Sequence, residues 1–177
     1  MCRQPHVPSR RIALRTLGLG AAGLLVGCGF QLRGTGVTMP FSSLQIRGVG
    51  NPGLISQLSA QLKSSGIEVI RNVPGDVAIK PEVVLEILQD QRERVVVGTT
   101  AAGQVRELQL RHRLRFRLRT PQGRDLIAET ELLQERELSF TETQVLGKEE
   151  EEALLYNDMQ NGLVRQLMMR LAAVKTL

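Results

Sequence analysis

The chain has few of the residues on which most catalytic and metal sites depend. Its 177 residues include two cysteines, two histidines, one tyrosine and no tryptophan. Two cysteines are too few for a disulfide framework or a four-cysteine zinc site. Aromatic residues make up only 3% of the chain, which leaves little to stack on nucleic-acid bases. We therefore expect no metal site and no nucleic-acid partner.

The composition is that of a globular protein with an unevenly placed positive charge. Hydrophobic residues make up 42% and charged residues 23%, which suits one ordinary domain with a core. Four of the 23 basic residues (Arg3, Arg10, Arg11 and Arg15) precede Cys28, and no acidic residue does. The remainder has 19 basic and 18 acidic residues, a net charge of +1. The net charge of +5 is therefore mostly a property of the N-terminal segment.

The N-terminal segment is typical of a secretory signal. The basic stretch is followed by the apolar run 17–26, which would rise only about 15 Å as a helix, half of a hydrocarbon core. The run ends in Leu25-Val26-Gly27-Cys28, which resembles a bacterial lipobox. We expect residues 1–27 to be removed, Cys28 to carry lipid, and residues 28–177 to form one domain. The alternative is a buried N-terminal helix with an incidental cysteine, and the export route, Sec or twin-arginine, stays open.

The first part of the mature chain predicts a βαβ unit. Leu44 to Arg47 alternate like a short strand. Asn51-Pro52 then opens a helix whose apolar stripe is Leu54, Ile55, Leu58 and Leu62. Gly66 ends this helix, and residues 67–70 form a second strand. Two strands joined by a helix favour a parallel pair.

From Glu82 onward the apolar residues recur with a period of two, which predicts an antiparallel meander. In the first strand, the pattern places Val83, Leu85 and Ile87 on one face and Glu86, Asp90, Arg92 and Arg94 on the other. A turn at 98–103 leads to residues 108–119, where leucine, phenylalanine and histidine alternate strictly with glutamine and arginine. The loop 120–124 and a return strand 126–140 complete the meander.

The chain ends in a long predicted helix. A loop 141–148 finishes at Lys148, and Glu149 to Glu152 open the helix at the end where the helix dipole favours acids. Its expected buried stripe is Leu155, Met159, Leu163, Leu167 and Leu171. The predicted fold class is α+β: a βαβ unit followed by an antiparallel meander, in a mixed sheet of four to five strands with two helices packed on one face.

The arginines of 111–119 allow two interpretations. If the 120–124 loop sets the register, Arg115 lies opposite Glu129 and Arg113 opposite Glu131. If the turn 98–103 closes the other hairpin, Arg115 faces Glu86, Arg111 faces Asp90, Leu114 faces Ile87 and Phe116 faces Leu85. Acids on both sides favour a salt-bridged, solvated face, with contributions of roughly 0.2–1 kcal/mol per pair. The other interpretation is a surface that faces phosphate groups.

No set of residues in the mature chain predicts catalysis. His112 is its only histidine and lies in the apolar row of its strand, so we interpret it as a histidine at the edge of the core. There is no Cys–His pair and no nucleophile elbow. Glu129 and Glu131 share one face of a strand beside arginines, an environment that does not favour an acid catalyst. We expect no enzymatic activity and no cofactor, and a hydrolase of envelope polymers is the least favoured hypothesis.

The start of the mature chain is similar to that of a known family. Cys28-Gly29-Phe30-Gln31-Leu32-Arg33-Gly34 resembles the N-terminus of lipopolysaccharide-assembly lipoproteins of the LptE type, and the predicted order of elements agrees. The resemblance implies a lipid-anchored protein of the outer membrane. It also implies a partner, the β-barrel LptD, which the protein plugs and helps to assemble, and binding of lipopolysaccharide during delivery to the outer leaflet. The alternative is an unrelated outer-membrane lipoprotein that acts as a pilotin or envelope adaptor.

The resemblance also implies where lipopolysaccharide would bind. The family uses a lysine in the loop before the last helix, and Lys148 stands at the matching place. A second family contact is an arginine in a turn before a Gly-Gln pair, but here the turn 98–103 is uncharged. Arg94 and Arg106 are the candidate replacements. The row residues Arg111, Arg113 and Arg115 complete the set of candidate ligands.

Overall fold

The computed structural model describes residues 38–70, 80–139 and 145–175. All of them belong to one compact unit, Gly36–Leu177. The predicted signal segment, the lipidation site Cys28 and the motif that follows it lie outside the described residues, as do nearly all of the predicted loop 72–81 and residues 140–144.

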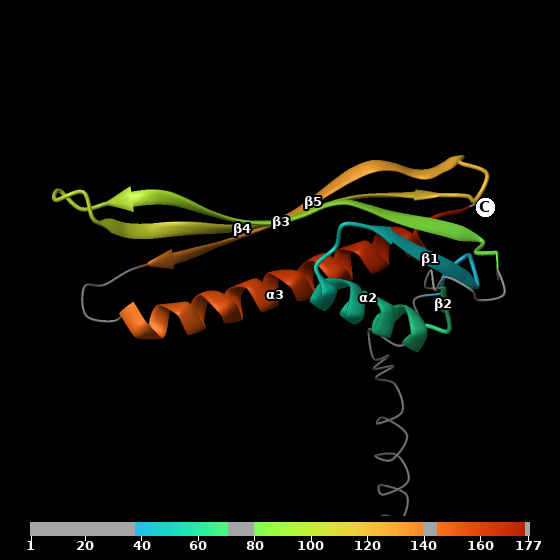
Figure 1. Ribbon diagram of the computed structural model, residues 1–177, viewed down its shortest axis with the longest axis horizontal. Coiled ribbons are helices and arrows are strands. Elements are labelled where there is room, and N and C mark those ends of the chain that lie inside the picture. The colour runs from blue at the N-terminus through green and yellow to red at the C-terminus, as the bar shows by residue number, and fades with distance from the viewer. Residues whose placement is uncertain (1–37, 71–79, 140–144, 176–177) are drawn as a thin grey trace, which may run out of the picture. The chain divides into compact units, whose positions relative to one another are not determined.

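The described residues form a five-stranded mixed sheet and two helices, which confirms the α+β prediction (Figure 1). Strand order across the sheet is β2-β1-β3-β4-β5; β1 is parallel to β2 and β3, while β3, β4 and β5 form an antiparallel meander. Both helices lie on the same side of the sheet in Figure 1. The elements are β1 (Ser43–Gly48), α2 (Pro52–Ser64), β2 (Glu68–Ile70), β3 (Val83–Thr99), β4 (Val105–Arg119), β5 (Asp125–Ser139) and α3 (Val145–Ala172).

The βαβ unit forms as its sequence predicts. Asn51 caps α2, because its side-chain oxygen accepts a hydrogen bond from the backbone N–H of Gly53 at 2.8 Å, and Pro52 is the first helical residue. The stripe of Leu54, Leu58 and Leu62 is fully buried against the sheet. After the helix, Gly66 adopts φ +82°, a conformation that glycine accepts readily.

The core fills the space between the helices and one face of the sheet. Its main cluster joins leucines of α2 to Leu85, Leu114 and Phe116 of the sheet and to Leu163 and Leu167 of α3. A smaller cluster under the far end of the sheet contains Leu108, Leu110, Leu138, Tyr156 and Met159. Complete burial of each such leucine contributes about 1.5–3 kcal/mol relative to exposure. The predicted stripe of α3 is confirmed, although Leu155 is only partly buried.

The predicted faces of β3 are wrong beyond Ile87. The register shifts between Ile87 and Gln89, so that Leu88 is an extra residue in a β-bulge. An extra residue inverts the alternation of side chains that follows it. Asp90 therefore lies opposite the buried Leu114, on the helix-covered face rather than beside Glu86.

The predicted pairing of β4 with β3 is also wrong. Strand β3 continues to Thr99, so the connecting turn is shorter than 98–103. As a result Arg115 faces Gln89 rather than Glu86, and Arg111 faces Glu93 rather than Asp90. Ile87, not Leu85, faces Phe116.

The pairing of β4 with β5 begins as predicted and then shifts. The backbone N–H of Thr120 donates to the carbonyl of Arg124 at 2.9 Å, which is the expected loop closure. Two irregularities add two residues to β5, so Arg115 pairs with Glu131 rather than Glu129, and Arg113 pairs with Leu133 rather than Glu131. Bulges of this kind cannot be found from strand alternation in β4, because the extra residues lie in the other strand.

Helix α3 begins earlier than its glutamates suggest. It runs from Val145, so Lys148 lies in its first turn and not in a preceding loop. Glu149 to Glu152 therefore lie in the second turn rather than the first, so the expected stabilisation by the helix dipole is weaker than predicted. Among the described residues, no helix combines the length and apolar character needed to span a membrane.

Candidate functional site

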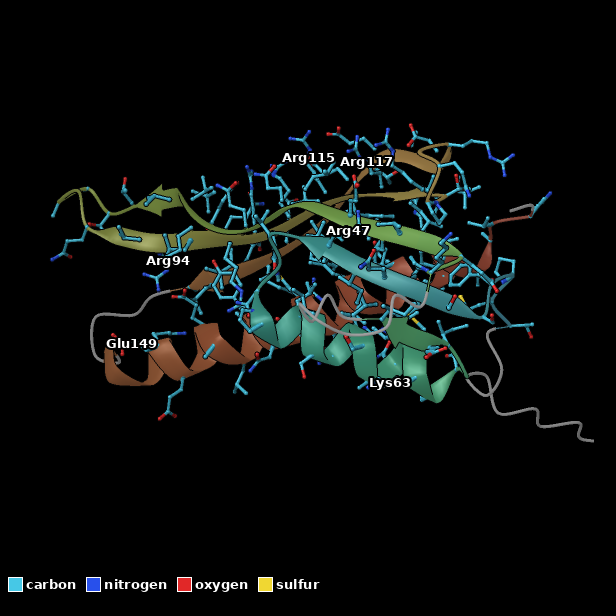
Figure 2. The ribbon with its side chains drawn as sticks, turned by 45° about the vertical axis from the view of Figure 1, so that its right-hand side comes forward. Arg47, Lys63, Arg94, Arg115, Arg117 and Glu149 are labelled. Carbon is cyan, nitrogen blue, oxygen red and sulfur yellow. The ribbon has the colours of Figure 1, made fainter. Side chains whose placement is uncertain are left out.

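Two groups of cations lie on opposite faces of the sheet. The first, here called the arginine row, is the set of alternate residues of β4 on the face away from the helices: Arg111, Arg113, Arg115, Arg117 and Arg119. Figure 2 shows Arg115 and Arg117 on that face and Arg94 on the side of α3. The two groups differ in how their charges are compensated.

Each member of the arginine row contacts at least one carboxylate. The ion pairs are Arg111–Glu135, Arg113–Glu93, Arg113–Glu131, Arg115–Glu129, Arg117–Glu86 and Arg119–Asp125. The expectation of a salt-bridged face is therefore confirmed, and two pairs are the predicted ones despite the shifted register, because long side chains reach diagonal neighbours. The hydrogen bond with Glu131 raises the pKa of the Arg113 guanidinium above its ordinary value.

The second group exists because of the bulge at Leu88. With the alternation inverted, Arg92 and Arg94 lie opposite His112 and Leu110, which are fully buried on the helix side. Both arginines therefore extend toward α3. The guanidinium of Arg92 hydrogen-bonds Gln160 of α3 at 3.1 Å.

These side chains line a groove between the sheet and the first turns of α3, here called the β3–α3 groove. Its volume is about 850 Å³. Its lining residues are Arg92, Arg94, Leu108, Lys148, Glu149, Glu152, Ala153 and Tyr156. The groove thus combines three cations with an apolar floor and one aromatic ring.

Carboxylates hold two of the groove cations in place. Nε of Arg94 lies 2.7 Å from Oε1 of Glu152, but 65% of the Arg94 side chain is exposed. Nζ of Lys148 lies 2.7 Å from Oε2 of Glu151, a residue outside the groove lining. Among the described residues, the three groove cations have two carboxylates as ion-pair partners, Glu152 and Glu151, whereas six carboxylates form ion pairs with the five arginines of the row. The groove is therefore the less compensated of the two surfaces.

Tyr156 forms the aromatic wall of the groove. Its hydroxyl donates to the backbone carbonyl of Glu93 at 2.8 Å, which ties α3 to β3. The guanidinium carbon of Arg92 lies 5.1 Å from the ring centroid, within cation–π range. Burial, and next the nearby charge of Glu152, raise the pKa of the Tyr156 hydroxyl, so it remains a neutral donor.

A buried histidine–aspartate pair lies behind the groove. Nε2 of His112 is 2.7 Å from Oδ1 of Asp90, and these side chains are 0% and 2% exposed. The other carboxylate oxygen accepts the backbone N–H of Asn51 at 2.7 Å, where α2 begins. Burial raises the pKa of Asp90, but the hydrogen bonds from His112 and Asn51 outweigh it and the net pKa is lowered. The pair joins the bulge to α2; sealed from solvent, it has no access to a substrate.

The structure brings together only some of the predicted site residues. Lys148 and Arg94 line the same groove. Arg106 is exposed near the start of β4 and forms no ion pair with another described residue. The row residues Arg111, Arg113 and Arg115 lie on the opposite face. Among the described residues, no cluster of histidine, cysteine or carboxylate side chains is placed to hold a metal ion.

Sequence reasoning missed Arg92, Tyr156 and the partner of His112. Arg92 and the partner of His112, Asp90, were missed for one reason: the bulge moves both residues to the helix side. One signal was available. Ile87-Leu88 places two large apolar residues in succession, which breaks the alternation of β3 and is typical of a bulge in a half-buried strand.

The mixed sheet with two helices on one face defines the fold of several bacterial lipoproteins. The solution structure of lipoprotein B from Nitrosomonas europaea is 29% identical over 82% of this chain and 91% of that one, with a TM-score of 0.68. A minor lipoprotein from Acinetobacter baumannii (18% identity; 76% and 93% covered) and the rare lipoprotein B from Shewanella oneidensis (18%; 74% and 94%) share the fold, each with a TM-score of 0.61. Curated protein sequences gave no match.

The family follows from the sequence itself. The model of the LptE family, described as lipopolysaccharide-assembly, matches residues 41–171. The chain therefore belongs to the LptE family. Membership supports a lipopolysaccharide-assembly role for a bacterial envelope lipoprotein and points away from catalysis.

Proposed function

We propose that this chain is the outer-membrane lipoprotein that plugs and helps to assemble an LptD-type β-barrel and that binds lipopolysaccharide during its delivery to the outer leaflet. The observation that carries the proposal is the family match together with the β3–α3 groove. Lipid on Cys28, after removal of residues 1–27, would hold the domain at the membrane. Two or more acyl chains on one residue would anchor it firmly.

The groove offers the chemistry that a phosphorylated glycolipid requires. Arg92, Arg94 and Lys148 can donate charge-assisted hydrogen bonds to phosphate oxygens, and Leu108 supplies an apolar floor. Phosphate would join Glu152 as a second acceptor on Arg94, whose guanidinium has further donors and whose side chain is 65% exposed. Glu152 itself is buried and keeps Arg94 as its partner. The arginine row, another candidate surface, is less favourable because every guanidinium there already contacts a carboxylate.

The opposite face has the character that a barrel lumen requires. Barrel interiors are polar, and a plug must present charged groups that remain compensated when water is partly displaced. The row and its carboxylates form such a surface across β3, β4 and β5. We therefore assign the row to the barrel and the groove to lipopolysaccharide.

Lipopolysaccharide binding is tested with purified domain and groove variants. Arg94→Ala combined with Lys148→Ala should weaken binding about tenfold, because two charge-assisted contacts are lost. The matched control is Lys63→Ala, a lysine on the exposed side of α2 that Figure 2 places away from Arg94. Equal affinity of the double variant and the control would contradict the groove assignment.

The barrel partnership is tested with the full-length lipoprotein in its native membrane. Extraction in mild detergent should recover a stable complex with a much larger outer-membrane β-barrel. A photo-crosslinker at Arg113 should then form a crosslink to the barrel, and one at Lys148 should form a crosslink to lipopolysaccharide. A lipoprotein that is recovered alone and retains no lipopolysaccharide would instead support a pilotin or envelope adaptor.

A further inference from the structure

The turn between β3 and β4 presents apolar side chains to solvent. Residues 95–105 contain no ionisable side chain; residues 48–62 lack one too, but there Leu54, Leu58 and Leu62 are buried. Three of the exposed large hydrophobic residues lie here: Val96, Val97 and Val105 are 51%, 50% and 43% exposed. Arg94 and Arg106 stand immediately before and after this segment, here called the apolar hairpin tip.

The tip extends beyond the helix layer. In Figure 1 the turn that joins β3 to β4 lies farther out than the first turn of α3, so neither helix covers it. The β3–α3 groove ends near its base, where Arg94 and Leu108 belong to the same two strands. An apolar tip is therefore continuous with the cationic groove.

Three hydrogen bonds close the turn at the end of the tip. The N–H of Thr100 donates to the carbonyl of Gln104 at 2.8 Å, and the N–H of Gly103 donates to the carbonyl of Thr100 at 2.9 Å. The N–H of Gln104 also donates to the Thr100 hydroxyl oxygen at 3.2 Å. Unpaired backbone groups are what make irregular segments costly in hydrocarbon. The turn lowers that cost at Thr100, Gly103 and Gln104, whose N–H groups are paired, while Ala101 and Ala102 at its end suit the boundary between headgroups and acyl chains.

The turn between β4 and β5 provides an internal comparison. It has the same hydrogen-bond pattern, with Thr120 and Gly123 in the places of Thr100 and Gly103, and both glycines have positive φ. Its neighbours are charged, with Arg119 paired to Asp125 and Arg124 beside them. The backbone geometry therefore does not account for the apolar character of the first turn.

We infer that the apolar hairpin tip contacts the acyl chains of lipopolysaccharide while the groove behind it binds the phosphate groups. The inference deepens the proposed function and rests on it. In an amphiphile with an anionic headgroup, phosphates and acyl chains are adjacent, and the tip and its flanking cations have the same order along β3 and β4. Apolar contact with cations at the headgroup level is how peripheral elements bind anionic lipid.

The chain contains no tryptophan, so one introduced tryptophan reports the environment of the tip without background. Ala101→Trp places the reporter in the tip, and Gln122→Trp places it at an exposed position of the other turn, beside Pro121, the counterpart of Ala101. With purified lipopolysaccharide, the Ala101→Trp emission should shift to shorter wavelength, and its quenching by acrylamide should fall by about threefold. The Gln122→Trp protein should change in neither respect.

A second pair of variants measures the contribution of the contact to affinity. Ala102→Glu should weaken lipopolysaccharide binding about tenfold, because a charge would enter the acyl-chain region. Gln122→Glu adds the same charge to the other turn and should change affinity less than twofold. Both substitutions are at exposed turn positions, so the fold should be retained, which circular dichroism checks.

The outcomes separate this inference from the proposed function. If lipopolysaccharide binds but Ala101→Trp stays accessible to acrylamide and Ala102→Glu binds normally, the tip assignment is overturned and the groove assignment stands. The tip would then be free to contact a protein partner. If the unmodified protein binds no lipopolysaccharide, the proposed function fails first and the tip assignment fails with it.

Discussion

Both faces of the sheet carry cations, and they use them differently. On the open face, five arginines alternate along one strand and each contacts a carboxylate on the same sheet. On the helix face, Arg92 and Arg94 of β3 and Lys148 of α3 line a groove. A regular pattern thus produces a compensated surface, and an irregular one produces a recess with cations available to a ligand.

The difference between the faces depends on one residue. Without the bulge at Leu88, Asp90, Arg92 and Arg94 would continue on the open face beside Glu86. The bulge sends the two arginines to α3 and buries Asp90, which then binds His112 and the N-terminus of α2. Bulges commonly re-aim side chains near functional sites. Here the bulge and its buried aspartate are expected to position the groove.

The largest expected effect is therefore the loss of Asp90. Asp90→Ala should lower the free energy of unfolding by about 3 kcal/mol, because the buried His112 ring nitrogen and the Asn51 N–H both lose their acceptor. Urea unfolding followed by circular dichroism measures it. The matched control is Glu93→Ala, which removes a carboxylate of the same strand on the open face, at a cost of less than about 1 kcal/mol. Equal effects would mean that the bulge does not distinguish the two faces.

The next effect is the pH dependence of the same contact. The folded-state pKa of Asp90 is lowered from about 3.8, so the unfolded chain binds the proton more tightly. The stabilisation is present above pH 3.8 and is lost as the pH falls through the folded-state pKa. The difference in unfolding free energy between the wild type and Asp90→Asn should therefore be smaller below pH 4 than at pH 5. Glu82 has a lowered pKa too, so only this difference isolates Asp90.

Sequence patterns predicted the parts of this molecule that obey one period. The helix opened by Asn51-Pro52 and the twelve-residue alternation of β4 were both confirmed. The errors occur where a strand gains a residue, at Leu88 and in β5, because alternation specifies a face only until the next bulge. The groove could not be predicted, since it requires the inverted half of β3 and a helix that begins at Val145 rather than Glu149.

A smaller effect separates the faces in ligand binding. Arg113→Gln combined with Arg115→Gln should change lipopolysaccharide affinity less than twofold, because both side chains are engaged by Glu131 and Glu129 on the open face. Arg94→Ala combined with Lys148→Ala should instead lower the affinity about tenfold in the same assay. A large loss from the row variants would move the phosphate contact to the open face. It would also make the row unavailable to a barrel.

The smallest effect concerns the row itself. The Arg115 and Glu129 side chains are 41% and 47% exposed, so solvent screens their attraction. A double-mutant cycle of Arg115→Ala and Glu129→Ala should give a coupling of less than about 1 kcal/mol. Arg117 and Glu86 are 31% and 23% exposed and should couple more strongly. Both couplings could also vanish in the free protein and appear only in the complex with the barrel. The ion pairs of the row would then contribute free energy only when the lumen buries them. That is the role that a row of paired charges suits.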